Sequence, residues 1–282
     1  MVKNMQNLPK TISRGELSDV IKTLEINNAH AKASISLWGA HILSFKPKHD
    51  NRERLFRSNK MVLDGTRSLR GGVPVCWPWF AQRPGFQMHG YVRMRNWHML
   101  SATENANYTE IVLTPYDTTG DGFDGTADLT LTVQVGERLS FTLMTTNTGE
   151  ESFEFNTALH TYFAVEDINE VELTGLSGSY LDKPQDFATM ETPAPYRFTE
   201  ETDRIHLNPV KQVSIMQPGS ETGVESAGHD SIVVWNPWAK NAAGLTDLGA
   251  DGYLTMLCVE TAVTQGKTLQ SGESHSLTQV VS

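Results

Sequence analysis

Apolar and polar residues alternate with a period of two along most of this chain. Such alternation is typical of strands that bury one face against a core. Between residues 128 and 149, the tripeptide GER separates two alternating runs and predicts a hairpin connection. No segment has the pattern of a twelve-residue amphipathic helix. Runs that predict strands lie within residues 31–47, 109–117, 128–149, 152–165, 169–178, 230–238, 252–262 and 274–281.

Strands joined by short turns, without intervening helices, favour an all-β antiparallel sandwich over an alternating α/β fold. No linker-like composition or fixed repeat divides the sequence, so we expect residues 1–282 to form a single domain. The stretch from residue 180 to residue 204 is rich in Pro, Asp and Thr and has the pattern of a long loop. Long loops in compact domains are often functional, and this one could cover a site.

Composition narrows the range of partners. The formal net charge of -10 argues against nucleic-acid binding, which requires a basic face. Cys76 and Cys258 lie far apart in apolar stretches, which indicates buried, reduced thiols and a reducing compartment. The first ten residues lack the features of a signal peptide, and no run approaches the length of a membrane span. We therefore expect a cytoplasmic protein without membrane partners.

The segment from residue 68 to residue 80, SLRGGVPVCWPWF, has an unusual composition. Adjacent glycines permit a sharp turn or a close approach to a ligand, and prolines restrict the backbone around Arg70, Trp77 and Trp79. Rigid aromatic rings beside a charged group suit a sugar. The alternative is a tight turn beside core tryptophans.

A second candidate segment follows, QMHGYVRMRNW. If this segment is extended, His89, Tyr91, Arg93 and Arg95 share one face. Two neighbouring arginines repel each other unless an anion or carboxylates neutralise them, which suggests an anion pocket. Ordinary surface arginines are the alternative.

Two further residues are candidates for proton transfer. In ESFEFNTALHTYFAV, strand alternation places His160 and Tyr162 on one face, either as hydrogen-bonded core residues or at an active site. Glu260 ends the apolar run of GYLTMLCVETA, where burial requires an ion-pair partner or a catalytic role. Neither a metal-binding motif nor a nucleotide-binding or serine-hydrolase motif occurs in the sequence, so we expect no metal and no cofactor.

The motifs LWGAHILSFKP, RGGVPVCWPWF, HGYVR, ALHTYF, TDR, VVWNP and CVETA occur here in one order. In these motifs the chain resembles the hexose-6-phosphate mutarotases, or glucose-6-phosphate 1-epimerases, of the aldose 1-epimerase superfamily. The resemblance implies a galactose-mutarotase-like supersandwich of antiparallel β-sheets. It also implies that His160 and Glu260 are the catalytic acid and base. The substrate-binding positions that it implies are Arg70, Arg93, Asp203 and His89.

The expected activity is interconversion of the α and β anomers of a hexose 6-phosphate, by a monomer. Ionised Glu260 would take the C1 hydroxyl proton while protonated His160 donates to the ring oxygen, across a pocket wide enough for a pyranose. The negative charge of Glu260 should favour the protonated form of His160, and the positive charge of His160 should favour the ionised form of Glu260. Alternatives are an unphosphorylated aldose as substrate, or a non-catalytic carbohydrate-binding module. Departures from the family pattern at residues 80–82 and at Met94 and Arg95 concern the pocket rim, and so the sugar preference.

Overall fold

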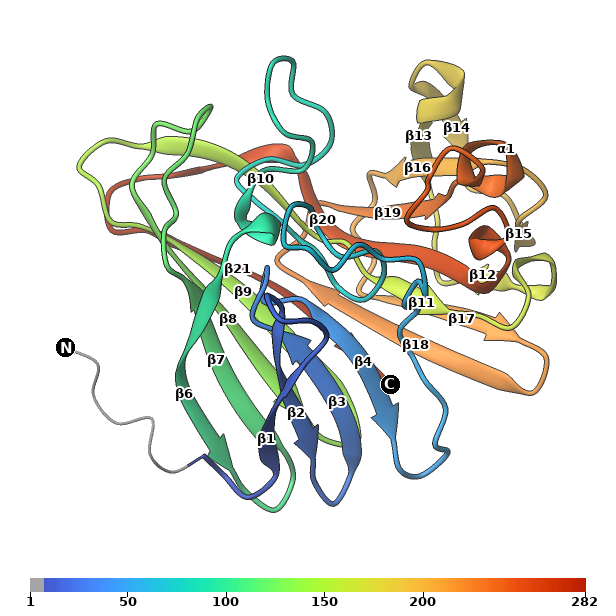
Figure 1. Ribbon diagram of the computed structural model, residues 1–282. Coiled ribbons are helices and arrows are strands. Elements are labelled where there is room, and N and C mark those ends of the chain that lie inside the picture. Colours follow the sequence, from blue (N-terminus) through green and yellow to red (C-terminus); the bar gives the residue numbers. More distant parts are fainter. Residues whose placement is uncertain (1–7) are drawn as a thin grey trace.

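The computed structural model describes residues 8–282, so most of the segment examined for a signal peptide lies outside the described residues. The strands form three sheets, and every strand pair in them is antiparallel, as the alternation predicted (Figure 1). The first sheet has the order β1-β2-β3-β4. Its strands are β1 (Ile12–Glu16), β2 (Lys22–Asn27), β3 (Ala31–Ser36) and β4 (Ile42–Pro47).

The second sheet, called the site sheet below, has eight strands. Seven of them run in the order β14-β13-β16-β19-β20-β10-β5, and β11 also pairs with β20. Figure 1 shows the long β20 crossing the middle of the molecule. The strands are β5 (Val75–Cys76), β10 (Phe153–Leu159), β11 (Tyr162–Ala164), β13 (Ser179–Asp182), β14 (Ala188–Glu191), β16 (Thr202–His206), β19 (Ser231–Asn236) and β20 (Met256–Leu269).

The third sheet has nine strands in the order β15-β12-β17-β18-β21-β9-β8-β7-β6. It contains the predicted hairpin, in which Val135 pairs with Leu139 across the GER turn. Its strands are β6 (Trp97–Glu104), β7 (Thr109–Pro115), β8 (Ala127–Val135), β9 (Leu139–Asn147), β12 (Glu172–Thr174), β15 (Tyr196–Arg197), β17 (Gln212–Gln217), β18 (Ser220–Ala227) and β21 (Ser274–Val281).

Helices are short. The single α-helix of the described chain, α1, has five residues, and no helix within residues 8–282 is both long and apolar enough to cross a bilayer. The helical elements are α1 (Trp238–Ala242) and the 3₁₀ turns η1 (Val92–Met94), η2 (Ile168–Glu170), η3 (Lys183–Gln185) and η4 (Gly252–Thr255).

The expectation of a long loop over residues 180–204 is wrong. This stretch forms the β13–β14 hairpin, the η3 turn between its strands, and the strands β15 and β16. All four residues of β14 are exposed, so this edge strand has no apolar alternation by which the sequence could reveal it. Short, solvated edge strands satisfy their backbone through pairing alone, which leaves their composition similar to that of a loop.

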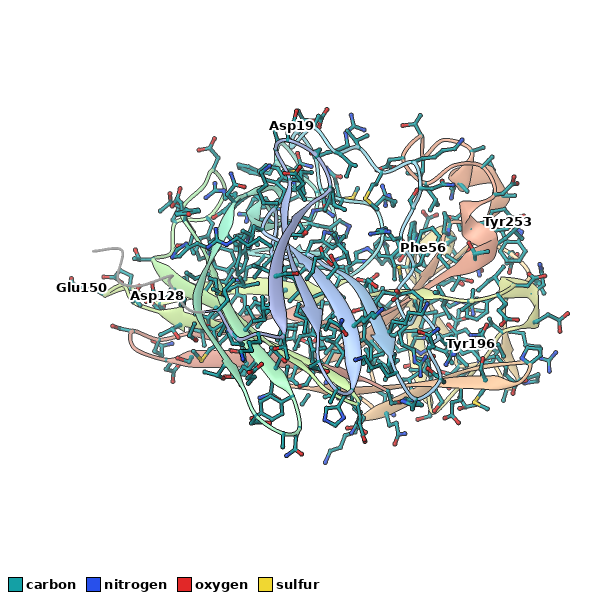
Figure 2. All side chains as sticks on the ribbon, turned by 60° about the horizontal axis from the view of Figure 1, so that its bottom comes forward. Asp19, Phe56, Asp128, Glu150, Tyr196 and Tyr253 are labelled. Atoms are coloured by element: carbon teal, nitrogen blue, oxygen red, sulfur yellow. The ribbon has the colours of Figure 1, made fainter. Side chains whose placement is uncertain are left out.

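Strand alternation gives the site sheet two different faces. On β20, Leu257, Val259 and Val263 belong to the main hydrophobic core, shared with the other two sheets. Cys258 and Ala262 point to the opposite face and belong to two smaller apolar clusters. Glu260 lies between these two on the same face. Figure 2 shows how densely side chains fill the space around the sheets, while Glu150 projects from the edge.

The adjacent glycines of the 68–80 segment make a tight turn against neighbouring backbone, not against a ligand. Gly71 and Gly72 have φ values of 107° and 58°, where residues with a side chain are strained. A Cβ atom on Gly71 would lie 2.4 Å from the Phe56 carbonyl oxygen, and one on Gly72 would lie 2.2 Å from that of Ile42. The turn therefore fixes the position of Arg70, which directly precedes it.

The side chain of His41 also holds this glycine turn in place. Its Nε2 atom donates a hydrogen bond to the Gly71 carbonyl oxygen, and the side chain is fully buried. Burial lowers the pKa of His41 to about 4, although the hydrogen bond acts in the opposite direction. The imidazole is therefore neutral in the folded protein at neutral pH.

This buried histidine predicts acid sensitivity of the fold. The unfolded chain takes up the His41 proton near pH 6.5, whereas the folded chain resists it down to about pH 4, so stability is lost as pH falls between these values. The contribution is about 3 kcal/mol. Urea unfolding at about pH 7 and about pH 4 should show a smaller acid loss in His41→Gln than in the wild type. His49→Gln, at an exposed position, should leave the loss unchanged.

Candidate active site

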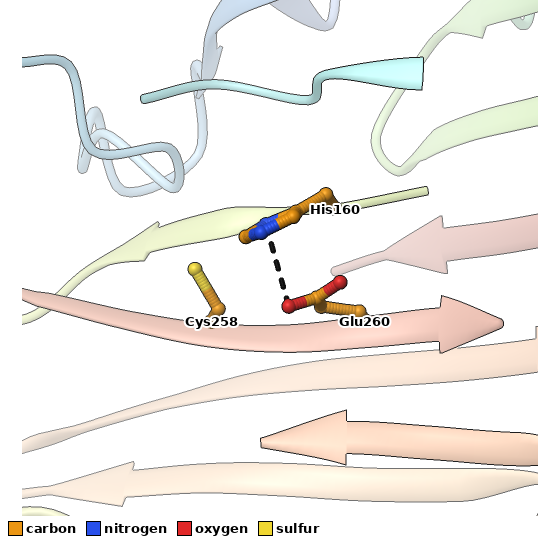
Figure 3. A group of neighbouring side chains, drawn as sticks. All are labelled: His160, Cys258 and Glu260. Carbon is orange, nitrogen blue, oxygen red and sulfur yellow. Dashed lines mark ion pairs between the residues drawn. The ribbon is translucent and has the colours of Figure 1, made fainter. Parts of the chain in front are cut away.

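His160 and Glu260 meet on the outer face of the site sheet. Glu260 lies on β20, and His160 occupies the break between β10 and β11, both of which pair with β20. The His160 Nδ1 atom lies 3.4 Å from Glu260 Oε1, and the side chains are 8% and 1% exposed (Figure 3). His160 stacks on Tyr162 with ring centroids 5.0 Å apart and planes inclined by 10°, as alternation placed them.

The two groups lie side by side, which corrects the expectation that a pyranose separates them. A gap of 3.4 Å holds no sugar ring. Adjacent groups are nevertheless suited to the same chemistry, because the ring oxygen and the C1 hydroxyl oxygen of an aldose are bonded to one carbon. Both groups line a cavity of about 320 Å³, large enough for a small ligand.

Burial determines the protonation of this pair. It lowers the pKa of His160 well below its ordinary value, and the positive charges of Arg93 and Arg70 lower it further. Burial and then the Asp203 carboxylate raise the pKa of Glu260 well above its ordinary value. The expectation that each charge holds the other is therefore wrong, because desolvation favours two neutral groups.

All six predicted site residues line this one cavity. They are Arg70, His89, Arg93, His160, Asp203 and Glu260. Arg70 donates a hydrogen bond of 2.8 Å to the Tyr162 hydroxyl group and lies 3.2 Å from an oxygen of Asp247. Arg93 donates to the Met88 carbonyl oxygen at 2.8 Å, and no carboxylate of residues 8–282 lies within 4.0 Å of it.

A second cavity of about 310 Å³ adjoins the first and shares Arg70, Arg93, Tyr162 and Leu245 with it. Three buried polar atoms of its lining have no hydrogen-bond partner in the described part of the protein: Ser68 Oγ, Arg70 Nε and Arg93 Nε. Buried donors without partners are costly, and an anion with several oxygens would satisfy them. This second cavity is called the arginine cavity below.

His89 and Asp203 lie on other walls of the cavity. Burial and then Arg93 lower the pKa of His89 well below its ordinary value, and its Nδ1 atom accepts a hydrogen bond of 3.1 Å from the Ala81 backbone. The ring therefore remains neutral. Asp203 accepts a hydrogen bond of 2.6 Å from Lys183, and burial raises the pKa of this carboxyl in spite of the nearby ammonium group.

Larger cavities of about 540 and 530 Å³ lie elsewhere on the molecule. Their linings do not bring an imidazole within 4.0 Å of a carboxylate. Volume alone therefore does not identify the functional site, and the buried acid–base pair does.

The family model of the aldose 1-epimerases matches residues 22–282. The chain belongs to the aldose 1-epimerase family. A relative from Escherichia coli K12, named "Putative glucose-6-phosphate 1-epimerase", is 34% identical over 92% of this chain and 88% of its own length. Members of the family are sugar-anomer isomerases, and the protein is therefore an epimerase that acts on a sugar.

Solved structures confirm the predicted galactose-mutarotase-like fold. The crystal structure of YeaD from Salmonella typhimurium, titled a "putative mutarotase", has a TM-score of 0.90 and 29% identity, with 98% of this chain and 94% of that chain covered. A galactose mutarotase related enzyme from Lactobacillus acidophilus has a TM-score of 0.70 over 92% of this chain and 96% of its own. At 13% identity, the latter shows the likeness of fold alone.

The structure decides between the alternatives for the aromatic residues of the epimerase and corrects the predicted position of Arg95. Trp77 and Trp79 are 0% and 4% exposed, so the core interpretation of these tryptophans is correct. The tryptophan that lines the cavity is Trp235. The 87–97 segment is not extended, because His89 has a φ of 63° and the η1 turn follows. Arg95 consequently leaves the site, stacks on Tyr91 at 4.2 Å and pairs with Asp117.

Lys183 is a cavity residue that the sequence analysis missed. It lies in the η3 turn, inside the stretch expected to be a loop, and no motif marks it. The sequence departs from the family pattern at residues 80–82 and 94–95. One residue of each segment lies at a cavity: Phe80 lines the first cavity, and Met94 lines the arginine cavity.

The buried carboxyl group of Glu260 should make the folded epimerase less stable as the pH rises from acidic to neutral values and above. Its raised pKa means that the unfolded chain loses the proton first, so stability falls as pH rises above about 4.5. The melting temperature of Glu260→Gln, measured relative to that of the wild type at the same pH, should therefore rise between about pH 5 and about pH 8. The rise should be about 2–4 °C for each kcal/mol of unfolding free energy that the wild type loses. Glu154→Gln, at an exposed position on β10, should show no such trend.

Proposed function

We propose that this epimerase interconverts the α and β anomers of a hexose 6-phosphate, with glucose 6-phosphate as the preferred substrate. The observation that carries the proposal is the pair of adjoining cavities that share Arg70 and Arg93. One cavity contains an acid–base pair, and the lining of the other includes two arginine Nε atoms and a serine Oγ atom that have no hydrogen-bond partner within residues 8–282. The name of the Escherichia coli relative supports the same substrate.

In the proposed mechanism, His160 and Glu260 exchange protons with the two oxygens on C1. Ionised Glu260 takes the proton of the C1 hydroxyl group while protonated His160 donates a proton to the ring oxygen, and the bond between C1 and the ring oxygen breaks. The products of this step are an open-chain aldehyde, a neutral imidazole and a neutral carboxyl group. Rotation about the C1–C2 bond, followed by the reverse transfers, closes the ring to the other anomer.

Burial of the pair assists this ring opening. The pair is charged when it faces the cyclic sugar and neutral when it faces the open aldehyde. Because desolvation favours neutral groups, the site stabilises the open-chain state relative to the ring. The cost of burying the charged pair thus becomes a driving force for the bond-breaking step.

The phosphate group of the substrate should restore the charged pair before reaction. Arg93 and Arg70 are the charges that lower the pKa of His160 most strongly after burial. A phosphate between these arginines would offset them and raise the pKa of His160 again. It would raise the pKa of Glu260 less, because Arg93 alone of the two arginines lowers the pKa of Glu260. Arginine is suited to this contact because its planar fork makes paired charge-assisted hydrogen bonds. In this proposal the phosphate contributes to catalysis as well as to binding.

Anomer-exchange NMR with glucose 6-phosphate tests the proposed function directly. The wild type should accelerate exchange, whereas His160→Asn and Glu260→Gln should each lose about 10²–10⁴-fold in rate, since each removes one proton-transfer group. Circular dichroism and melting curves would establish that both variants fold. Near-wild-type exchange in either variant would reject the catalytic pair.

Glucose and galactose serve as unphosphorylated substrates in the same assay. Faster exchange of either one than of glucose 6-phosphate would identify an aldose mutarotase. Sugar binding without acceleration of exchange would identify a carbohydrate-binding module.

The arginine cavity predicts that a free phosphate-like anion activates the enzyme on a truncated substrate. Inorganic phosphite should increase kcat/KM of the wild type for glucose, because it would occupy the place of the missing phosphate group. Arg93→Ala should raise KM for glucose 6-phosphate at least tenfold and abolish phosphite activation, with a smaller effect on glucose alone. Arg70→Ala should act in the same direction, in part through its lost contact with Tyr162.

Arg138→Ala is a suitable control, because Arg138 lies in the turn between β8 and β9 and pairs with Glu225. It should change neither measurement. Equal losses on glucose and glucose 6-phosphate in Arg93→Ala would contradict the assignment of the arginine cavity to phosphate.

A further inference from the structure

A third chemically active side chain lies beside the proposed catalytic pair. Cys258 precedes Glu260 by two residues on β20, so both point to the same face of the site sheet, toward His160 (Figure 3). One nitrogen, one sulfur and one oxygen atom of His160, Cys258 and Glu260 all lie within 4.8 Å of one another. The sequence concealed this group because nearly one hundred residues separate His160 from the other two.

The three side chains of this group are buried, and each has a potential metal-ligand atom that is not engaged elsewhere in the described part of the protein. His160 Nδ1 and Glu260 Oε2 have no hydrogen-bond partner in the described part of the protein. Cys258 is a free cysteine with 0% exposure. Two unpartnered polar atoms close to a free thiol match a set of metal ligands, because buried polar atoms normally find partners.

These donors match the chemistry of zinc. Zinc takes nitrogen, oxygen and thiolate ligands at about 2.0–2.3 Å in a tetrahedron, whose ligand atoms are then about 3.5 Å apart. The separation of 3.4 Å between His160 and Glu260 already has this value. Cys258 needs only a small side-chain movement. Three protein ligands leave a fourth position for water. His160 and Glu260 line the first cavity, so an ion can reach them from it.

We propose that His160, Cys258 and Glu260 form a binding site for zinc, and that zinc bound there inhibits the epimerase. Binding releases two protons to solvent, one from the Cys258 thiol and one from the neutral carboxyl group of Glu260, and leaves a thiolate and a carboxylate on the ion. The ion engages the imidazole nitrogen and the carboxylate oxygen that would otherwise move protons. Only the inhibitory effect rests on the proposed function, since the binding itself depends on the geometry of the three ligands.

Zinc titration of the metal-free protein tests the site in two independent ways. In anomer exchange with glucose 6-phosphate, zinc should inhibit the wild type with one ion bound per chain. Magnesium should not inhibit, since it prefers oxygen ligands. Cobalt(II) should give a thiolate-to-metal charge-transfer absorption band, a signal that does not depend on activity.

Cys258→Ala should bind zinc at least tenfold more weakly and lose the cobalt band, while it retains exchange activity in the absence of metal. Cys258→Ser gives a second test if the alanine variant fails to fold. Cys76→Ala is the matched control, because Cys76 is also 0% exposed but belongs to the neighbouring apolar cluster. It should keep both the inhibition and the band.

Undiminished zinc affinity in both folded Cys258 variants would overturn the site, as would a wild type that binds no zinc. A wild type that shows the cobalt band but no exchange activity without metal would refute the proposed function and leave the metal site intact. The two failures are thus distinguishable.

Discussion

The contact between the His160 imidazole and the Glu260 carboxyl group is the interaction on which the rest of the site depends. Both groups are almost fully enclosed, on a sheet face flanked by two apolar clusters. Such burial is unfavourable for each charged form, so this part of the fold does not add stability. It is retained at the expense of stability, as is common for active sites, and the large core on the opposite face of β20 stabilises the strand that carries it.

Much of the fold follows from local pattern in the sequence. Period-two alternation predicts the long strands, because each buries one face, and the hairpin between β8 and β9 follows from two such runs around a short turn. The β13–β14 hairpin does not follow, because its edge strand is exposed on both faces. Local pattern therefore detects strands that contribute to a core and misses strands held by backbone pairing alone.

Motif resemblance predicted much of the site, whereas local spacing predicted little of it. Motif resemblance placed Arg70, His89 and Arg93 in one cavity with the acid–base pair, although local spacing had put Arg93 and Arg95 on one face. The η1 turn, which contains Arg93 and ends before Arg95, separates these two arginines. Lys183 and Trp235 reach the cavity through strand order in the site sheet, which is a long-range property that no single segment encodes.

Charge in the combined cavities gives a physical reason for a phosphorylated substrate. Arg67, Arg70, Arg93 and Lys183 contribute four positive charges, against the two carboxylates of Asp203 and Asp247. The walls thus carry an excess of positive charge while the pair of His160 and Glu260 is neutral. A phosphate group with close to two negative charges would balance this excess. In the proposed function, a phosphate that offsets both arginines favours the shared proton on His160, because Arg93 and Arg70 both lower the pKa of His160 whereas Arg93 alone of the two lowers that of Glu260. This is the arrangement that ring opening requires. A neutral sugar fills the same space but leaves the proton on the carboxyl group, so the anion provides what shape alone does not.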